Sequence, residues 1–372
     1  MEHNIDFISN CGLYIHVPFC KSKCAYCDFY RIIDLGLLDK YIESLIGELG
    51  SYKDKICKID TIYFGGGTPS VLGYKRLDMI LKYIIQNYDL SELRELTVEC
   101  NPENVDDDLI KILSENGVNR ISLGVQTLDN NMLKSLGRRH DEKKVYESID
   151  IIRKYGIKNI SVDMIFGLPK IGNYEFEKDV EKFVNLDIEH LSIYALSYES
   201  GSWLTKLVEK GKIKPLDDDS VTDQYSYITK VMCDKGFDHY EISNYSKKGF
   251  QSKHNSACWK RIPYIGVGPG ASSFDGKKRW SNIPDLEKYV DGNIEKEEDI
   301  IDEKDIYNEI VMLGLRTAEG VCLDNIDVKY RSNFLSEANK LIEEGKMMKK
   351  NSNYFIKESE WFLLDLITES IL

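Results

Sequence analysis

The sequence has no long apolar run and no excess of basic charge, and each absence excludes a class of protein. No segment of the 372 residues approaches the roughly 20 consecutive apolar residues that a transmembrane helix needs. The first residues, Met-Glu-His-Asn-Ile-Asp, are polar and acidic, so we expect no signal peptide. The formal net charge is −13 and the basic runs are short. Since nucleic-acid-binding proteins usually carry a basic surface, the charge argues against a nucleic acid partner without excluding one.

Two common nucleotide-binding motifs are also missing. The glycine run from Gly65 to Ser70 is not followed by Gly-Lys-Ser/Thr, so it is no phosphate-binding P-loop, and it does not match the dinucleotide fingerprint. The sequence contains no internal repeat and no low-complexity stretch. A hydrophobic content of 42% with 30% charged residues is ordinary for a globular protein, and the length leaves room for one large domain and a smaller one.

Nine cysteines are present without the short secreted framework that would pair them, which favours a reducing compartment and predicts a cytoplasmic protein. Five of them have no partner at ligand spacing, and we expect them to be ordinary packed thiols. These five are Cys11, Cys57, Cys100, Cys233 and Cys322.

Three further cysteines, Cys20, Cys24 and Cys27, follow the spacing C-x3-C-x2-C and have no fourth cysteine nearby. Structural zinc sites and ferredoxin-type clusters usually take four ligands. Three close thiolates instead predict a [4Fe–4S] cluster with one open iron that binds a ligand. The neighbouring Lys21 and Lys23 are expected to favour the thiolate forms, because nearby positive charge lowers a thiol pKa.

A strand–helix alternation runs through the first two thirds of the chain. The candidate strands are rich in Ile, Val, Tyr and Phe, as strands buried on both faces are. They are Leu13–Val17, Thr61–Phe64, Leu96–Glu99, Arg120–Val125, Ile160–Phe166 and Leu191–Leu196. The candidate helices are Leu37–Leu49, Tyr74–Asn87, Asp106–Asn116, Glu142–Tyr155, Tyr174–Val184 and Asp219–Lys235. Six such units predict an α/β fold with a partial (β/α)6 barrel, with an open doubly wound sheet as the alternative.

The pattern changes after residue 237. We expect a barrel domain over residues 1–237, a bridging segment along the barrel edge over 238–282, and a mostly helical, winged-helix-like domain over 283–372. In the last domain, helices are predicted over Glu303–Thr317 and Asn333–Glu344, a hairpin over Lys346–Ile356 and a closing helix over Glu358–Ile371.

Polar or glycine residues follow several predicted strands, at the edge where barrel enzymes place their chemistry. Glycines after the second strand would let the backbone approach a ligand closely. Glu99 ends the third strand, Gln126 the fourth, and Asp163 lies in the fifth. Arg138 is expected in a helix next to Gly137. Each alone is more often structural, but together they share one rim with the three cysteines.

The cysteine motif, the Gly65–Pro69 run, Glu99–Pro102, Gly124–Gln126 and Asp163–Pro169 resemble the radical S-adenosylmethionine (SAM) superfamily, and within it the oxygen-independent coproporphyrinogen III oxidase family. The resemblance extends to Tyr264–Gly270 and Met312–Arg316, so it covers nearly the whole chain. It implies that one electron from the cluster cleaves bound SAM to methionine and a 5′-deoxyadenosyl radical. The SAM-site residues that the resemblance implies are Tyr14, Tyr26, Gly66, Gly67, Thr68, Glu99, Gln126, Arg138 and Asp163.

One position separates two branches of this family. The oxidases show a fourth cysteine two residues after the third, whereas this chain has Phe29, which resembles the HemW-type heme chaperones. The chaperones share an H-N-x-x-Y-W motif; here it reads His254-Asn255-Ser256-Ala257-Cys258-Trp259. The resemblance implies that His254 contacts heme, while Cys258 either ligates or packs.

That branch implies a chaperone that binds heme and passes it to a membrane-bound respiratory protein, with a flavodoxin or ferredoxin as electron donor. The alternative is coproporphyrinogen III oxidation by decarboxylation. A radical-SAM enzyme that modifies RNA is a weaker alternative, because the negative net charge disfavours binding to RNA.

Overall fold

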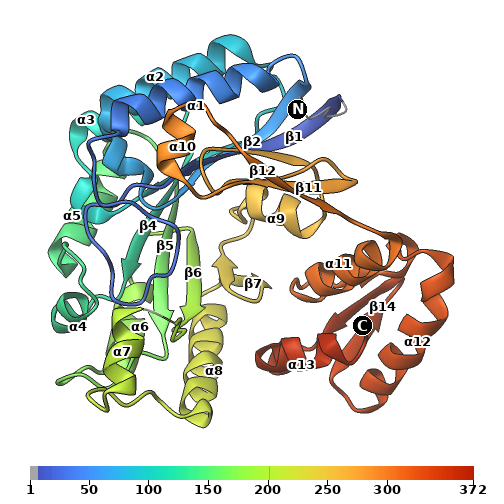
Figure 1. Cartoon of the computed structure of the whole chain (residues 1–372). Coiled ribbons are helices and arrows are strands. Elements are labelled where there is room, and N and C mark those ends of the chain that lie inside the picture. The colour runs from blue at the N-terminus through green and yellow to red at the C-terminus, as the bar shows by residue number, and fades with distance from the viewer. Residues whose placement is uncertain (1–6, 201) are drawn as a thin grey trace.

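The computed structural model describes residues 7–200 and 202–372. It shows a large α/β body and a smaller C-terminal part beside it, drawn in orange to red in Figure 1. The α/β body is built on a sheet of twelve strands among the described residues. The smaller part holds a separate sheet of three strands.

The first six strands are parallel and lie side by side in the order of the chain. They are β1 (Ile8–Val17), β2 (Ile56–Gly66), β3 (Glu95–Cys100), β4 (Arg120–Gln126), β5 (Asn159–Phe166) and β6 (His190–Ala195). A doubly wound sheet would reverse its strand order at a switch point, and this one does not. The predicted partial barrel is therefore confirmed, and the doubly wound alternative is wrong.

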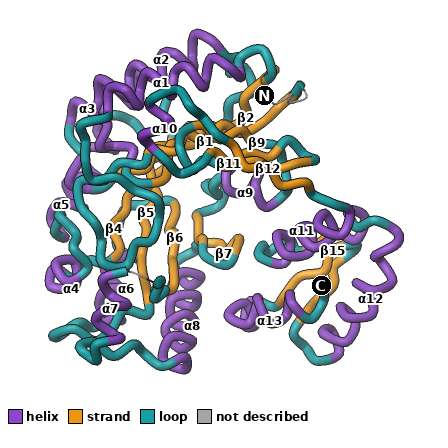
Figure 2. Tube along the Cα trace, viewed as in Figure 1, coloured by secondary structure: helices purple, strands orange, loops and turns teal. Residues whose placement is uncertain are grey.

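Helices cover the outside of these strands (Figure 2). The six predicted helices are all present, with ends that differ by a few residues. They are α1 (Leu38–Tyr52), α2 (Gly73–Asn87), α3 (Asp107–Glu115), α5 (Glu142–Lys154), α6 (Phe176–Val184) and α8 (Asp218–Asp234). Two short helices were not predicted, α4 (Asn130–Ser135) and α7 (Trp203–Glu209), since one or two turns give no readable periodicity.

The segment after α8 crosses from one edge of the barrel sheet to the other. At the β6 edge it forms two antiparallel strands, β7 (Asp238–Glu241) and β8 (Asn244–Ser246). In the sheet, β8 lies next to β6 and β7 is the edge strand. It then continues through the short helix α9 (Lys253–Trp259), which contacts β2, to β9 (Tyr264–Val267), which pairs in parallel with β1.

Three antiparallel strands extend the sheet beyond β9. They are β10 (Ser272–Phe274), β11 (Lys278–Asn282) and β12 (Lys296–Ile300), and α10 (Leu286–Val290) lies between the last two. The last strand follows the predicted boundary at 282/283 and was not predicted, because its sequence Lys-Glu-Glu-Asp-Ile is mostly charged and exposed. The three domain boundaries themselves stay a prediction.

The C-terminal part has the predicted order of helix, helix, hairpin and helix. Its helices are α11 (Glu303–Leu315), α12 (Val328–Glu343) and α13 (Leu364–Glu369), and its antiparallel sheet is β13 (Val321–Cys322), β15 (Asn353–Ile356) and β14 (Met347–Lys350). The single closing helix predicted over Glu358–Ile371 is wrong in detail, since Glu358–Leu363 forms a 3-10 turn before α13.

This part docks on β7 and β8 of the large body. His239 stacks on Tyr245 with ring centroids 4.0 Å apart, meets the edge of Trp361, and lies 2.8 Å from Glu358 Oε1 through Nδ1. Among the described residues, no helix combines the length and the apolar character that crossing a bilayer requires.

Candidate functional site

A cavity of about 450 Å³ opens at the carboxyl ends of the barrel strands. Eleven of the thirteen predicted site residues line it: Cys20, Cys24, Tyr26, Cys27, Gly66, Gly67, Thr68, Glu99, Gln126, Arg138 and Asp163. They come from the end of β2, from the segments that follow β1, β2 and β4, and from the carboxyl-terminal halves of β3, β4 and β5. Parallel strands bring their carboxyl ends to one edge, which is why residues as far apart in the sequence as Cys20 and Asp163 meet here. Tyr14 and His254 do not line the cavity.

The cysteine loop is held at both of its ends and in its middle. The backbone N–H groups of Cys20 and Ile32 donate across its neck to Ile32 O and Pro18 O, at 3.0 and 2.6 Å. In the middle, Ala25 donates to Leu136 O after α4 and accepts from Leu204 N of α7, both at 3.0 Å. The two short helices that the sequence did not reveal are therefore what anchors the loop.

The three thiols surround the cavity at separate points. No three His, Cys, Asp or Glu side chains among the described residues converge as the ligands of one metal ion do. Each sulfur instead has its own polar side-chain neighbour: Cys20 Sγ lies 3.5 Å from Thr68 Oγ1, Cys24 Sγ 3.4 Å from Arg138 Nη1, and Cys27 Sγ 3.3 Å from Arg31 Nη1.

The expectation that Lys21 and Lys23 favour thiolates is wrong. Burial raises the pKa of Cys20 and of Cys27, and it outweighs the charge of Arg31, which lowers both values. The two lysines are exposed to solvent, where their charge is screened. In the protein without a metal these two thiols are protonated at neutral pH, so binding a metal releases protons.

The glycine run is required for a close approach between two chain segments. Gly66 has a φ of +104°, and a Cβ there would lie 2.7 Å from the ring of His16. A Cβ on Gly67 would lie 2.8 Å from Phe19 O and 2.9 Å from Val17 O. Only glycine lets β2 end this close to the start of the cysteine loop. The close approach that the structure shows is to other segments of the chain, whereas the approach to a ligand that the sequence predicted stays a prediction.

Two half-buried carboxyl groups face the same cavity. Glu99 accepts a hydrogen bond from Tyr63 Oη at 2.6 Å, and Asp163 accepts one from Ser122 Oγ at 3.4 Å. Burial raises the pKa of Glu99 to about 7 and that of Asp163 to about 6, and the charge of Asp163 further raises the value of Glu99. A cationic ligand would relieve both the desolvation and the mutual repulsion of the pair.

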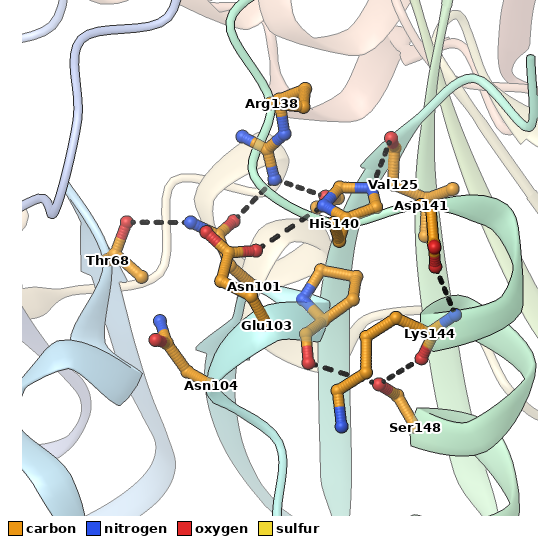
Figure 3. A network of polar contacts seen from close by, with 12 residues as sticks. Thr68, Asn101, Glu103, Asn104, Val125, Arg138, His140, Asp141, Lys144 and Ser148 are labelled. Carbon is orange, nitrogen blue, oxygen red and sulfur yellow. Dashed lines mark hydrogen bonds and ion pairs between the residues drawn. The ribbon is translucent and has the colours of Figure 1, made fainter. Parts of the chain in front are cut away.

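Arg138 lies in the loop after α4, so the prediction that it belongs to a helix is wrong. Figure 3 shows its guanidinium among polar groups of the strand ends. Nη2 donates to Asn101 Oδ1 at 2.7 Å and to Gly124 O at 2.5 Å. Asn101 Nδ2 donates in turn to Thr68 Oγ1 at 3.2 Å, which connects Arg138 to the neighbour of Cys20. Nε of Arg138 is buried without a protein partner.

A second pair in Figure 3 supports this network from below. His140 Nδ1 lies 3.3 Å from Glu103 Oε2, and its Nε2 lies 3.3 Å from Val125 O. Burial alone would raise the pKa of Glu103, but the contact with His140 and the charge of Arg138 hold it below its usual range. Glu103 therefore stays ionised and helps to balance the charge of the half-buried Arg138.

Gln126 and Tyr26 complete the wall of the cavity. Gln126 has a φ of +73° at a bulge that ends β4, a conformation that costs a non-glycine residue about 1–3 kcal/mol. Such strain is typical of residues held in place for a ligand. Tyr26 packs against the small apolar cluster that includes Leu136 and Ile165, and burial raises its pKa.

Tyr14 lies in the barrel wall beneath the cavity. Its hydroxyl is 3.0 Å from His16 Nδ1, and its ring centroid is 6.2 Å from that of Tyr63. Burial raises the pKa of Tyr14, and so does the nearby charge of Glu99. It therefore contacts the residues that support the cavity and not the cavity itself.

His254 lies at the other end of the barrel. Its Nδ1 is 2.8 Å from Thr61 Oγ1, and its ring stacks on Tyr63 with centroids 5.2 Å apart. Thr61 precedes Gly66 in β2 by five residues, or about 16 Å at 3.3 Å per residue. Burial lowers the pKa of His254 to about 4, so the imidazole is neutral at pH 7. Glu95 accepts from the backbone N–H groups of Lys253 and His254 at 2.8 and 3.1 Å, which anchors α9.

Three polar residues of the site were not predicted. Asn101 and Glu103 flank Pro102 after β3. Their position directly after Glu99, at the end of a predicted strand, could have marked them as site residues. Arg31 follows Cys27 by four residues, and nothing in the sequence distinguishes it from an exposed arginine.

Comparison with known proteins identifies the family of the chain. A family model described as the radical SAM superfamily matches residues 14–183. The heme chaperone HemW of Lactococcus lactis is 39% identical over 325 residues, which cover 86% of this chain and 85% of that protein. HemW of Bacillus subtilis is 36% identical over 330 residues, covering 85% and 86%.

Among solved structures, coproporphyrinogen III oxidase (HemN) from Escherichia coli, a radical SAM enzyme, matches with a TM-score of 0.83 over 98% of this chain and 90% of that one, at 19% identity. This likeness shows a shared fold. The identity to the two bacterial relatives over nearly full length goes further. The chain belongs to the radical SAM superfamily and, within its coproporphyrinogen III oxidase-like proteins, to the HemW-type heme chaperone family.

Proposed function

We propose that this protein is a radical-SAM heme chaperone, which holds a [4Fe–4S] cluster, SAM and heme and passes the heme to a membrane-bound respiratory protein. The observation that carries the proposal is the meeting of three free cysteines, two half-buried carboxyl groups and a half-buried arginine in one cavity, in a chain 36–39% identical to two proteins named as heme chaperones.

The residues present fit a cluster. Cys20, Cys24 and Cys27 are all free, all line the cavity and all have a polar neighbour at the sulfur. A cubane cluster takes its thiolates at separate irons, so separate positions around a cavity suit it better than a single convergent point. Three cysteines leave a fourth iron for SAM, and the bound cluster would supply one-electron chemistry to it.

The cavity also fits SAM, which carries an ammonium, a sulfonium, a carboxylate and ribose hydroxyls. Glu99 and Asp163 offer acceptors for the cationic groups and the hydroxyls, and burial raises the pKa of both carboxyl groups. Arg138 offers its unpartnered Nε to the carboxylate. The family's other SAM-site positions, Tyr26 and Gln126, lie in the same wall.

Heme binding is proposed on the family and on the motif that begins with His254. A neutral imidazole is the form that ligates iron, and the pKa of His254 keeps it neutral. Because its ring is enclosed by Thr61 and Tyr63, direct ligation requires α9 to separate from β2. Burial raises the pKa of Cys258 to about 11, so its thiol is protonated, and we propose that it packs and does not ligate.

The oxidase alternative ranks second. Phe29 stands at the rim of the cavity, 68% exposed, where the resembling oxidases have a further cysteine. RNA modification ranks third, because the net charge of −13 disfavours a polyanion. We further propose a cytoplasmic location, because nine free cysteines are typical of a protein in a reducing compartment. We also propose a flavodoxin or ferredoxin as the electron donor.

Heme titration of anaerobically reconstituted protein, followed by the Soret band, tests the proposal. We expect near-stoichiometric binding that weakens at least tenfold in His254→Ala. His190→Asn is the matched control, because His190 is also buried in the barrel but is bonded to Ser161 and Tyr240. Absence of binding, or equal binding by the His254 variant, would count against the proposal. Formation of protoporphyrinogen from coproporphyrinogen III with reductant and SAM would favour the oxidase instead.

A further inference from the structure

Arg31 makes contacts that no other basic residue of the cysteine loop makes. Its Nη1 donates to Cys27 Sγ at 3.3 Å and to Phe29 O at 2.9 Å, and its Nη2 donates to Cys27 O at 2.6 Å. The planar guanidinium thus holds both the sulfur and the carbonyl of one cysteine. Through the two carbonyls, it also fixes the turn that carries that cysteine.

The three side chains near the sulfurs differ in what else they do. Thr68 also accepts a hydrogen bond from Asn101, and Arg138 also bonds Asn101 and Gly124 O. Every hydrogen bond that Arg31 donates goes to Cys27 or to Phe29. In the described part of the chain Arg31 forms no ion pair with a carboxylate, so no paired acidic side chain offsets its charge beside Cys27 Sγ.

We propose that Arg31 is a positioning residue that raises the reduction potential of the cluster by acting through Cys27. This inference rests on the proposed function, since it needs a cluster on the three cysteines. On reduction, an external low-potential donor loses one electron and the cluster gains it, passing from the 2+ to the 1+ state; no bond is broken and no proton moves. The added negative charge spreads onto the thiolates.

The physical reason is electrostatic. Hydrogen bonds to the sulfurs and the net charge around a cluster are among the main determinants of its potential. An N–H donor and a positive charge at Cys27 stabilise the more negative, reduced state more than the oxidised state. The site is partly enclosed, so solvent screens this charge less than it screens the exposed Lys21 and Lys23.

Replacing Arg31 by methionine keeps an unbranched apolar stem but removes the donor and the charge. At a fixed potential near the midpoint, we expect the ratio of reduced to oxidised cluster to fall at least tenfold, which corresponds to about 59 mV for a one-electron couple. Arg31→Lys keeps the charge but loses the two-pronged guanidinium donor, and its reduction potential should lie between those of the wild type and Arg31→Met. Lys23→Met is the matched control, because it removes one charge from the same loop without touching a sulfur; we expect a change below threefold.

The measurement is a redox titration of the reconstituted protein, with the reduced cluster followed by electron paramagnetic resonance. The potential is a property of each loaded cluster, so partial loading of a variant does not alter it, and Arg31→Lys provides a second value if Arg31→Met loads poorly. Equal potentials for loaded wild type and both Arg31 variants would overturn this inference alone. A wild-type protein that takes up no iron and sulfide would overturn the proposed function as well.

Discussion

Replacing Glu99 by glutamine should make the metal-free protein more stable at neutral pH. Burial and the charge of Asp163 raise the pKa of Glu99 from 4.5 to about 7, a rise that corresponds to about 3 kcal/mol. The folded state therefore binds the proton more tightly than the unfolded state. Below pH 4.5 Glu99 is protonated in both states and costs the folded state nothing. As the pH rises from 4.5 to about 7, ionisation of Glu99 progressively lowers the free energy of unfolding, and above about pH 7 its effect is constant. Glutamine does not ionise and keeps an acceptor for Tyr63.

Urea unfolding of the metal-free protein between pH 5 and pH 8 measures this effect. Glu99→Gln should exceed the wild type by about 3 kcal/mol at pH 8 and by less than about 1 kcal/mol at pH 5. Glu358→Gln is a control of opposite sign, because the contact with His239 lowers the pKa of Glu358 and the ionised form there is the stabilising one. A Glu99 variant that is no more stable at pH 8, or whose advantage does not depend on pH, would refute the reasoning.

Three further predictions follow from the cavity. SAM binding to the reconstituted protein, measured by equilibrium dialysis, should weaken up to about tenfold between pH 7 and pH 6, as the carboxylate of Glu99 becomes protonated; a flat profile would contradict a cationic contact. Arg138→Met should weaken SAM binding about 10- to 100-fold, because a charged hydrogen bond is worth about 1.5–3 kcal/mol, and unchanged binding would remove Arg138 from the site. Gly66→Ala should lower the unfolding free energy by at least about 2 kcal/mol, because the new Cβ meets the His16 ring at a positive φ. Gly73→Ala is the control, because Gly73 also has a positive φ but a Cβ there meets no atom; it measures the cost of the backbone conformation without the clash.

The barrel and its rim of polar residues could be predicted from the sequence because both follow from local patterns. Continuous apolar runs mark strands buried on both faces, and parallel strands must end at one edge. Glu99, Gln126 and Asp163 therefore had to lie near the cysteines, and they do. The glycines after β2 do allow a close approach, but the approach that the structure shows is to the chain segment that begins the cysteine loop.

Features that depend on how distant segments dock could not be predicted. The place of His254 is decided by Glu95, which lies 159 residues earlier and accepts from the first turn of α9. The N–H donors that anchor α9 carry no sequence signal of that pairing. The role of Arg31 depends on the turn of the cysteine loop, which is set by backbone hydrogen bonds and not by a motif. Charge patterns misled at Lys21 and Lys23, because burial and not sequence neighbourhood decides the pKa of the thiols.

The most direct test of this account is to quantify iron and sulfide on one anaerobically reconstituted sample of the wild type and one of the variant with Cys20, Cys24 and Cys27 all replaced by alanine. The account predicts close to four irons and four sulfides per wild-type chain, and almost none in the triple variant. Wild-type protein without iron and sulfide, or a triple variant that retains them, would contradict it.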